Sequence, residues 1–289
     1  MKVSGFTFIR NAVKYDYPVV EAITSVLPLC DEFIVMVGNS NDETMQLIEQ
    51  INSPKIRIFH SVWDDNLREG GRVLAVETDK AFKKISPDSH WAFYIQADEV
   101  LHEQYHTTVK QAMQQHLNDQ RVEGLLFDYI HFYGSYDYVG DSRRWYPNEI
   151  RIVRNLPGIQ SYRDAQGFRI NGRKLKVKKV NACIYHYGWV KPPEKQLEKQ
   201  KAFHALWHDE TWIKQHVTDE KEFDYSRIDA LKKFEGAHPQ VMQERINKTN
   251  WTFRFDPSKR KEKFTYRLLN WINRKTGLDL GRYKNYTLI

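Results

Sequence analysis

The first hundred residues alternate between short apolar runs and segments with helical spacing. Residues 33–37 form a continuous apolar run, which is typical of a strand buried on both faces. Residues 18–29 place Val19, Ile23 and Val26 three or four positions apart, which predicts a helix. Further strands are expected over 3–9, 55–60 and 91–96, and further helices over 42–51 and 71–85. This order predicts an α/β fold with a mostly parallel central sheet flanked by helices.

The pattern changes after residue 104. A helix is expected over 103–117, strands over 124–133, 150–154, 174–180 and 183–187, and helices over 194–208, 225–234 and 263–273. The last three helices are separated from the strand-rich part by Pro192 and Pro193, and proline is well tolerated in the first turn of a helix. We therefore expect an α/β domain over residues 1–190 and a helical C-terminal region over 191–289.

Length and composition favour a folded protein without membrane-spanning segments. The chain has 289 residues, of which 41% are hydrophobic, enough for a sizeable core. Its apolar runs are much shorter than the roughly 20 residues that a spanning helix needs. The first residues lack the apolar stretch of a signal peptide, and two cysteines, Cys30 and Cys183, make no disulfide framework. We therefore expect a cytoplasmic location.

The positive charge is concentrated near the end of the sequence. Residues 240–289 hold 12 Lys and Arg against 4 Asp and Glu, a net charge of +8, whereas the rest of the chain is close to neutral. Such a segment is typical of contact with anionic lipid, nucleic acid or an acidic partner. A lysine-rich surface that only aids solubility has the same composition.

Polar residues follow each of the first four predicted strands. They are Arg10 and Asn11, the segment 38–42, the segment 63–66, and the segment 96–99. In a parallel sheet these loops line one edge, where ligands bind. Asp98 and Glu99 come directly after an apolar strand, and carboxylates held in this way suit a divalent cation with a phosphate. The alternative is an acidic pair that faces water.

The order and spacing of these segments resemble the family 2 glycosyltransferases of bacterial cell-surface polysaccharide synthesis, which are inverting enzymes with the GT-A fold. The likeness covers about residues 3–190 and rests on Phe6 to Asn11, Phe33 to Thr44 and Tyr94 to Glu99. The resemblance implies a GT-A domain over 1–190 that binds a nucleotide-sugar and transfers the sugar to a carbohydrate or lipid-linked glycan. Two features differ: Gln96 replaces the first acid of the Asp-X-Asp motif, and Gly38 follows the second strand where an acid is usual.

The resemblance also implies roles for individual residues. A divalent cation, Mn²⁺ or Mg²⁺, is expected on Asp98 and His186, with Glu99 as a further ligand. Asp164 is expected to be the general base that activates the acceptor, with Glu149 as the second candidate. Contacts to the nucleotide-sugar are expected from Arg10, Asn11, Asn39, Arg72, Gln96, Ala97 and Lys191. Lys195 and Lys199 follow Lys191 at intervals of four, so they either cover the diphosphate or face solvent.

Alternatives to sugar transfer remain open. A nucleotidyltransferase would use a related α/β sheet, although the first strand is not followed by a glycine-rich phosphate loop with a lysine. A nucleic-acid-binding protein would use the basic segment around 251–261, but no nucleic-acid motif is present and no such partner is expected.

Residues 263–274 mix Phe264, Leu268 and Trp271 with cations. This mixture favours either docking on the catalytic domain or peripheral contact of residues 240–289 with the inner face of a membrane.

Overall fold

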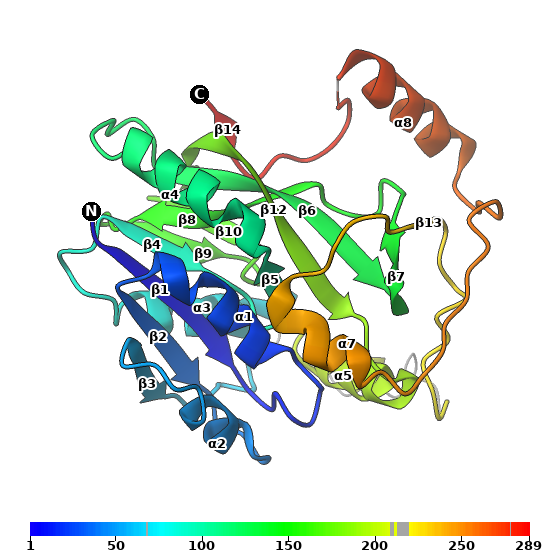
Figure 1. Cartoon of the computed structure of the whole chain (residues 1–289), viewed down its shortest axis with the longest axis horizontal. Helices are drawn as coiled ribbons and strands as arrows, with labels where there is room; N and C mark the ends of the chain where they lie inside the picture. The colour runs from blue at the N-terminus through cyan, green and yellow to red at the C-terminus, as the bar shows by residue number, and fades with distance from the viewer. Residues whose placement is uncertain (68, 209–210, 213–219, 278) are drawn as a thin grey trace.

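The computed structural model describes residues 1–67, 69–208, 211–212, 220–277 and 279–289. Four parallel strands form the first half of the central sheet, in the order β3 (Ile56–His60), β2 (Glu32–Val37), β1 (Val3–Ile9) and β4 (Trp91–Tyr94). Helices α1 (Val19–Val26), α2 (Thr44–Glu49) and α3 (Arg72–Phe82) connect them (Figure 1). The predicted alternation of strands and helices is confirmed, with each helix one to three residues shorter at each end.

The second half of the sheet is mixed. β8 (Asn148–Arg154) runs antiparallel to β4, β6 (Gly124–Tyr133) runs antiparallel to β8, and β12 (Lys176–Trp189) runs parallel to β6. The short strands β5 (Glu99–Leu101), β7 (Ser135–Gly140), β13 (Leu231–Lys233) and β14 (Thr287–Leu288) extend it. The two strands expected over 174–180 and 183–187 are one continuous strand, β12. The mostly parallel α/β architecture is therefore confirmed.

Both faces of the sheet are covered, which explains the continuous apolar run in β2. Phe33 and Val35 belong to the core cluster that also contains residues of α1 and α4 (His106–Gln115). Ile34 and Met36 belong to a second cluster that contains Ala81 of α3. Because successive side chains of a strand point to opposite faces, every residue of β2 needs an apolar neighbour. The central sheet thus lies between two layers of helices.

A small antiparallel sheet lies beside α3. Its strands are β9 (Ile159–Tyr162), β10 (Gly167–Ile170) and β11 (Arg173–Lys174). The turn between β9 and β10 carries Asp164, and both of its neighbours, Arg163 and Ala165, have positive φ angles. A positive φ costs an L-residue conformational energy, so this turn is tightly specified by its surroundings.

The C-terminal region contains α5 (Pro193–Ala205), α7 (Gln243–Asn247) and α8 (Phe264–Thr276). The helix predicted over 225–234 is wrong: this segment is a turn followed by β13, which pairs with β7. Tyr225, Ile228 and Leu231 pack against Tyr133 and Tyr138, so a sheet edge takes up the apolar residues that suggested a helix. Since β13 and β14 both join the central sheet, the division at residue 190 remains a prediction.

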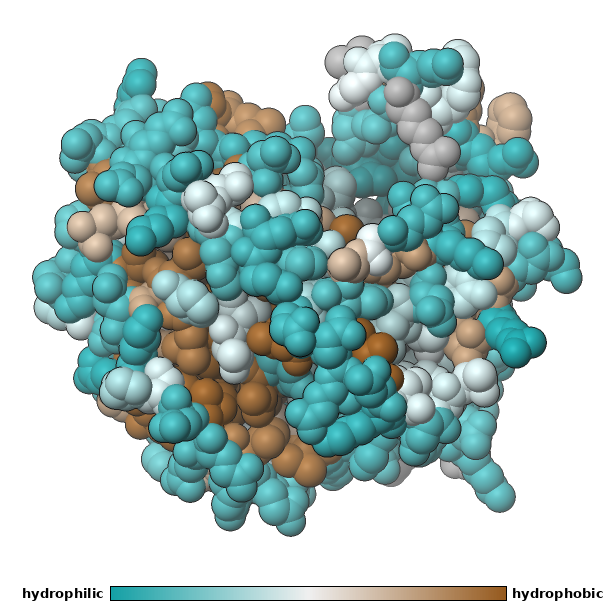
Figure 2. Space-filling view, viewed as in Figure 1, coloured by the Kyte–Doolittle hydropathy of each residue, from teal (hydrophilic) through white to brown (hydrophobic). Residues whose placement is uncertain are grey.

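The last helix, α8, stands apart from the sheet in Figure 1. Its apolar side chains Phe264 and Trp271 are 76% and 60% exposed. Figure 2 shows that this face of the molecule is largely hydrophilic, with a band of apolar residues in its lower left half. Among the described residues, no helix is long and apolar enough to span a membrane.

Candidate functional site

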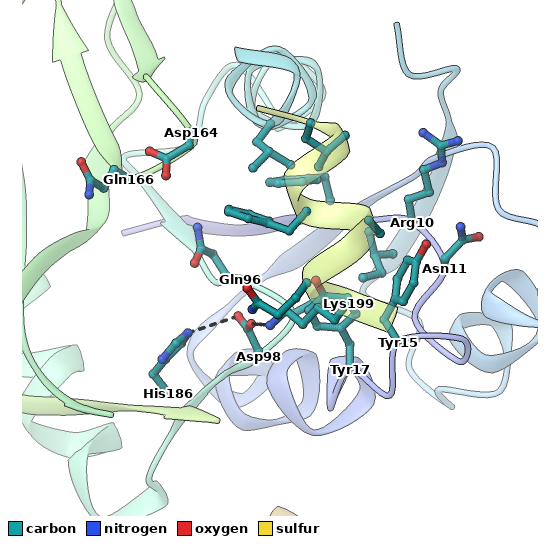
Figure 3. A pocket seen from close by; sticks show the side chains of 18 of the residues that line it. Arg10, Asn11, Tyr15, Tyr17, Gln96, Asp98, Asp164, Gln166, His186 and Lys199 are labelled. Atoms are coloured by element: carbon teal, nitrogen blue, oxygen red, sulfur yellow. Dashed lines mark hydrogen bonds and ion pairs between the residues drawn. The ribbon is translucent and has the colours of Figure 1, made fainter. Parts of the chain in front are cut away.

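A cavity of about 570 Å³ lies at the carboxyl ends of β1 and β4. The strand order reverses between these two strands, and open α/β sheets bind ligands at such switch points. Eight of the predicted site residues line the cavity: Arg10, Asn11, Gln96, Ala97, Asp98, Glu149, Asp164 and His186. Figure 3 shows Arg10 and Asn11 at one end and Asp164 and Gln166 at the other, with Asp98 and Lys199 between them.

Asp98 lies in the middle of the cavity and is almost completely buried. Its Oδ2 atom accepts a hydrogen bond from Lys199 Nζ at 3.0 Å, and its Oδ1 atom lies 3.8 Å from Nε2 of His186 (Figure 3). Burial disfavours the charged carboxylate, but the charge and the hydrogen bond of Lys199 outweigh it and hold the pKa of Asp98 well below its ordinary value. Asp98 is therefore ionised over the whole physiological range.

His186 is held by a second histidine, His131. Nδ1 of His131 lies 3.1 Å from Nδ1 of His186, and Nε2 of His131 lies 2.7 Å from the carbonyl oxygen of Tyr146. Burial lowers the pKa of both imidazoles, so both are neutral at pH 7. Since a carbonyl only accepts, His131 donates from Nε2 and accepts at Nδ1. His186 therefore donates from its Nδ1 atom to Nδ1 of His131.

The structure contradicts Glu99 as a metal ligand. Glu99 is completely buried, and both of its oxygens accept hydrogen bonds from Arg151, at 2.7 Å each. Tyr129 and the backbone N–H of Gln96 donate to the same carboxylate. A bidentate pair of this kind is strong and directional. Glu99 therefore anchors the end of β4 to β8 and has no oxygen left for a cation.

The set of donors around Asp98 does not fit a divalent cation. Gln96 supplies an amide in place of a carboxylate, and its Nε2 atom donates to the carbonyl oxygen of Ala165 at 3.2 Å. Within the described ranges, no group of three His, Cys, Asp or Glu side chains is placed to hold a metal ion. Hard cations prefer several oxygen ligands with negative charge. Here one carboxylate is already paired with an ammonium group.

Lys191 does not line the cavity. Its side chain is completely buried, and Nζ donates to the carbonyl oxygens of Tyr15 and Asp16 at 2.8 and 3.1 Å. Burial, with repulsion from Lys199, lowers its pKa well below the ordinary value. The predicted contact of Lys191 with a nucleotide-sugar is thus contradicted. Lys191 instead fixes the segment whose Tyr15 and Tyr17 side chains form part of the cavity wall.

Two further predicted contacts also lie outside the cavity. Asn39 is exposed, and its side-chain oxygen accepts a hydrogen bond from the backbone N–H of Trp63 at 3.1 Å. Arg72 is exposed at the first position of α3. Neither residue is among those that line the cavity. Asn39 helps to position Trp63, whose ring is part of the wall.

Asp164 and Glu149 form the acidic end of the cavity. Burial raises the pKa of the half-buried Asp164 above its ordinary value. Burial raises the pKa of Glu149 further, to about 8, and the charges of Glu99 and Asp164 add to this effect. Within the described part of the chain, Oε2 of Glu149 has no hydrogen-bond partner. At neutral pH, Glu149 is therefore protonated, whereas a less perturbed Asp164 is the better proton acceptor.

Gly71 allows Asp164 to approach α3. A Cβ atom on Gly71 would lie 2.8 Å from Cβ of Asp164 and 3.0 Å from the ring of Trp207. Gly71 also has a φ angle of 69°, which favours glycine. The glycine therefore makes room for the Asp164 turn.

Several cavity residues have no individual signal in the sequence. Tyr15, Tyr17 and Trp63 are aromatic side chains of loops, and most aromatic residues in a sequence fill the core. From the sequence, Lys199 either covers the diphosphate or faces solvent, as most lysines on helices do. The structure places Lys199 in the cavity and pairs Lys195 with Glu198 outside it. His131 could not be recognised, because its partner His186 lies 55 residues away.

Comparisons with solved structures return glycosyltransferase names at low similarity. S. aureus TarS is 17% identical with a TM-score of 0.39, and the match covers 70% of this chain and 39% of that chain. TarS 1–349 in complex with UDP is 16% identical, with 75% of this chain and 70% of that chain covered and the same TM-score. Glucosyl-3-phosphoglycerate synthase from Mycobacterium tuberculosis, in complex with Mn²⁺, UDP and phosphoglyceric acid, is 17% identical, with 45% and 43% covered and a TM-score of 0.30.

No family model matches the sequence, and no curated protein is similar to it. The chain spans about two fifths of the first TarS chain. At these TM-scores the likenesses assign neither a family nor an activity, and the functional conclusion rests on the geometry of the cavity.

Proposed function

We propose that the chain is an inverting glycosyltransferase that moves a sugar from a nucleotide-diphosphate sugar to a carbohydrate or lipid-linked glycan. One observation carries the proposal. A cavity at the switch point of a parallel sheet has a strand-end carboxylate, Asp98, at its centre and a second, more weakly acidic carboxyl pair at one end. A bound diphosphate and an acceptor hydroxyl need these two separate regions.

The end of the cavity near β1 suits the nucleoside. Phe8 and Trp63 face it with ring centroids 5.8 Å apart, and the guanidinium of Arg10 lies 5.4 Å from the ring of Trp63. Arg10 is oriented by Asp65, which accepts a hydrogen bond from it at 2.7 Å. Aromatic faces stack on nucleobases, so the Trp63 ring with Arg10 beside it offers a surface for the base.

The other end of the cavity suits the acceptor. Asp164 takes the proton of the acceptor hydroxyl as its oxygen attacks the anomeric carbon. The bond from that carbon to the diphosphate breaks on the opposite side, and its electron pair leaves with the diphosphate. This single displacement inverts the configuration of the anomeric carbon. Gln96 supports the base, because it holds the turn that carries Asp164 through its hydrogen bond to Ala165.

The test is a transfer assay with UDP-, GDP-, CDP- and dTDP-sugars, in which release of the free nucleoside diphosphate is measured. Asp164→Asn is expected to lower turnover by at least about 100-fold, because it removes the general base. The thermal unfolding temperature should stay close to that of the wild type. The control is Asp42→Asn, because Asp42 lies outside the cavity, whereas Gln166 of the same turn lines it.

The same assay separates the alternatives. Unchanged turnover in Asp164→Asn would remove Asp164 as the base. Release of pyrophosphate in place of a nucleoside diphosphate would identify a nucleotidyltransferase. Salt-sensitive binding to heparin, without a response to any nucleotide, would favour the nucleic-acid alternative.

We also propose that α8 contacts an anionic lipid surface, which would bring the enzyme to a lipid-linked acceptor. Phe264, Leu268 and Trp271 lie on one face of the helix, at positions i, i+4 and i+7, and all are exposed. Lys263 and Arg267 are exposed beside them. An apolar face bordered by cations is the pattern of helices that lie in a membrane interface.

A further inference from the structure

We infer that the ammonium group of Lys199 takes the place of a divalent cation, so that this chain binds the diphosphate of its donor without a metal ion. The inference rests on the proposed function, because it assigns the group that meets the leaving diphosphate. It makes Lys199 a catalytic residue and explains why the residues around Asp98 do not form a metal site.

The contacts of Lys199 place its charge in the cavity. Nζ donates to Oδ2 of Asp98 at 3.0 Å and to the carbonyl oxygen of Gly188 at 2.9 Å. It lies 4.7 Å from the ring centroid of Tyr17, and the side chain lines the cavity with 12% of its surface exposed. An ammonium group has three N–H donors. Two are taken by these acceptors, and the third meets the hydroxyl of Tyr17, which a phosphate oxygen of the donor would replace.

The position of this ammonium group depends on a glycine. A Cβ atom on Gly188 would lie 2.6 Å from Oδ2 of Asp98 and 2.7 Å from Nε2 of His186. No side chain fits there, and the carbonyl of the same residue accepts from Lys199. Asp98 and Gly188 thus accept from the same cationic group, and the absence of a side chain at residue 188 leaves room for it.

The charges near Asp98 also favour a monovalent cation. Gln96 is neutral, and the charge of Glu99 is balanced by Arg151. The charges of Asp98 and Lys199 then sum to zero. A divalent ion at Asp98 would meet a single carboxylate, and the ammonium group that lies 3.0 Å from this carboxylate would repel the ion. Lys199 already supplies the positive charge that balances Asp98.

The chemical role follows from the bond that breaks. When the bond between the anomeric carbon and the diphosphate breaks, the electron pair remains on the phosphate oxygen. The ammonium of Lys199 then donates a hydrogen bond to the diphosphate and offsets the charge that develops there. No proton needs to be transferred to the leaving group, since a nucleoside diphosphate is stable as an anion.

The experiment measures binding of UDP, GDP, CDP and dTDP, and of the four matching nucleosides, by calorimetry in the presence of EDTA. The wild type is expected to bind one of the diphosphates under these conditions. Lys199→Gln is expected to weaken that diphosphate about 10- to 100-fold, because a charged hydrogen bond is lost, and to leave the nucleoside almost unchanged. Lys201→Gln is the matched control on the same helix, since Lys201 does not line the cavity.

The outcomes separate the inference from the proposed function. Binding of a diphosphate only when Mn²⁺ or Mg²⁺ is added, with equal affinity in the wild type and Lys199→Gln, would overturn the role of Lys199 and leave the glycosyltransferase proposal standing. Absence of binding to all four diphosphates, with and without metal, would count against the proposed function itself. An equal loss for the diphosphate and the nucleoside would also overturn the inference, because Lys199 would then make no specific contact with the diphosphate.

Discussion

At the scale of single residues, two carboxyl groups face the same cavity in different protonation states. Glu149 lies on a strand and is almost completely buried, whereas Asp164 lies on a turn and is half-buried. Burial disfavours the charged form of both, but it does so more strongly for Glu149, whose pKa is raised to about 8. This difference favours Asp164 over Glu149 as the proposed proton acceptor.

The raised pKa of Glu149 predicts how stability changes with pH. Between the ordinary pKa of 4.5 and the folded value of about 8, the folded protein keeps a proton that the unfolded chain has released. The free energy of unfolding therefore loses a contribution as pH rises from 5 to 8, of the order of 1.4 kcal/mol per unit of pKa difference. Glu149→Gln removes this loss. Its free energy of unfolding relative to the wild type should increase from pH 5 to pH 8, as measured by urea denaturation.

Asp79→Asn provides the comparison, because its carboxyl group is less buried and lies outside the cavity wall. If the wild type and Glu149→Gln lost stability in parallel between pH 5 and pH 8, the raised pKa of Glu149 would be wrong.

At the scale of elements, the turn between β9 and β10 has to be brought close to the start of α3. Two consecutive glycines precede that helix, and both have positive φ angles, 60° for Gly70 and 69° for Gly71. Only Gly71 faces the turn, since a Cβ atom on Gly70 would meet nothing within 4 Å. Both glycines therefore adopt a backbone conformation that favours glycine, but only Gly71 also leaves space for Asp164.

Gly71→Ala is expected to displace the Asp164 turn and to lower turnover by about 10-fold or more, since a small misplacement of a catalytic group is costly. Binding of the nucleoside diphosphate, at the other end of the cavity, should change little. Gly70→Ala is the matched control: it carries the same backbone strain, of about 1–2 kcal/mol, without the contact. Equal turnover in the two variants would contradict a role of Gly71 in placing Asp164.

The elements themselves were largely predictable. Strands β1 to β4 and helices α1 to α3 follow from local periodicity, because each buries a face that its own residues define. The segment 225–234 has comparable apolar spacing but is not a helix. Its apolar residues pack against aromatic residues of β6 and β7, and three of its residues pair with β7. The conformation of this segment depends on its pairing with β7, and the local sequence pattern does not show which strand is available for pairing.

At the scale of the whole molecule, the positive charge and the exposed apolar residues coincide. The region 240–289 carries a net charge of +8, and it contains α8, whose Phe264, Leu268 and Trp271 are exposed by 76%, 47% and 60%. The remainder of the chain is close to neutral. A molecule with this distribution has one preferred orientation at an anionic surface.

The wild type is therefore expected to sediment with vesicles that contain anionic lipid and not with vesicles of phosphatidylcholine alone. Replacing Phe264 and Trp271 by Ser should weaken this binding several-fold, because two apolar side chains no longer enter the interface. Val62→Ser is the control, since Val62 is 74% exposed on a loop after β3. Identical sedimentation of all three proteins would rule out α8 as the contact.

The candidate site was predictable in part. Asp98 and the residues after β1 could be proposed because the ends of parallel strands meet at one edge of a sheet, whereas Asp164 and His186 were expected from the family resemblance alone. Glu99 and Lys191 could not be excluded in advance. Their partners, Arg151 and the carbonyl oxygens of residues 15 and 16, are distant in sequence, and only the packed structure shows that these side chains are fully engaged.

The sequence by itself determined the α/β framework and the edge of the sheet at which the chemistry gathers, because side-chain periodicity is a property of neighbouring residues. The tertiary structure decided which charges meet there. Lys199 and Asp98 are 101 residues apart, and Glu99 and Arg151 are 52 apart. Whether a carboxylate is paired, protonated or free depends on groups that the fold brings within a few ångströms, where burial strengthens every electrostatic interaction.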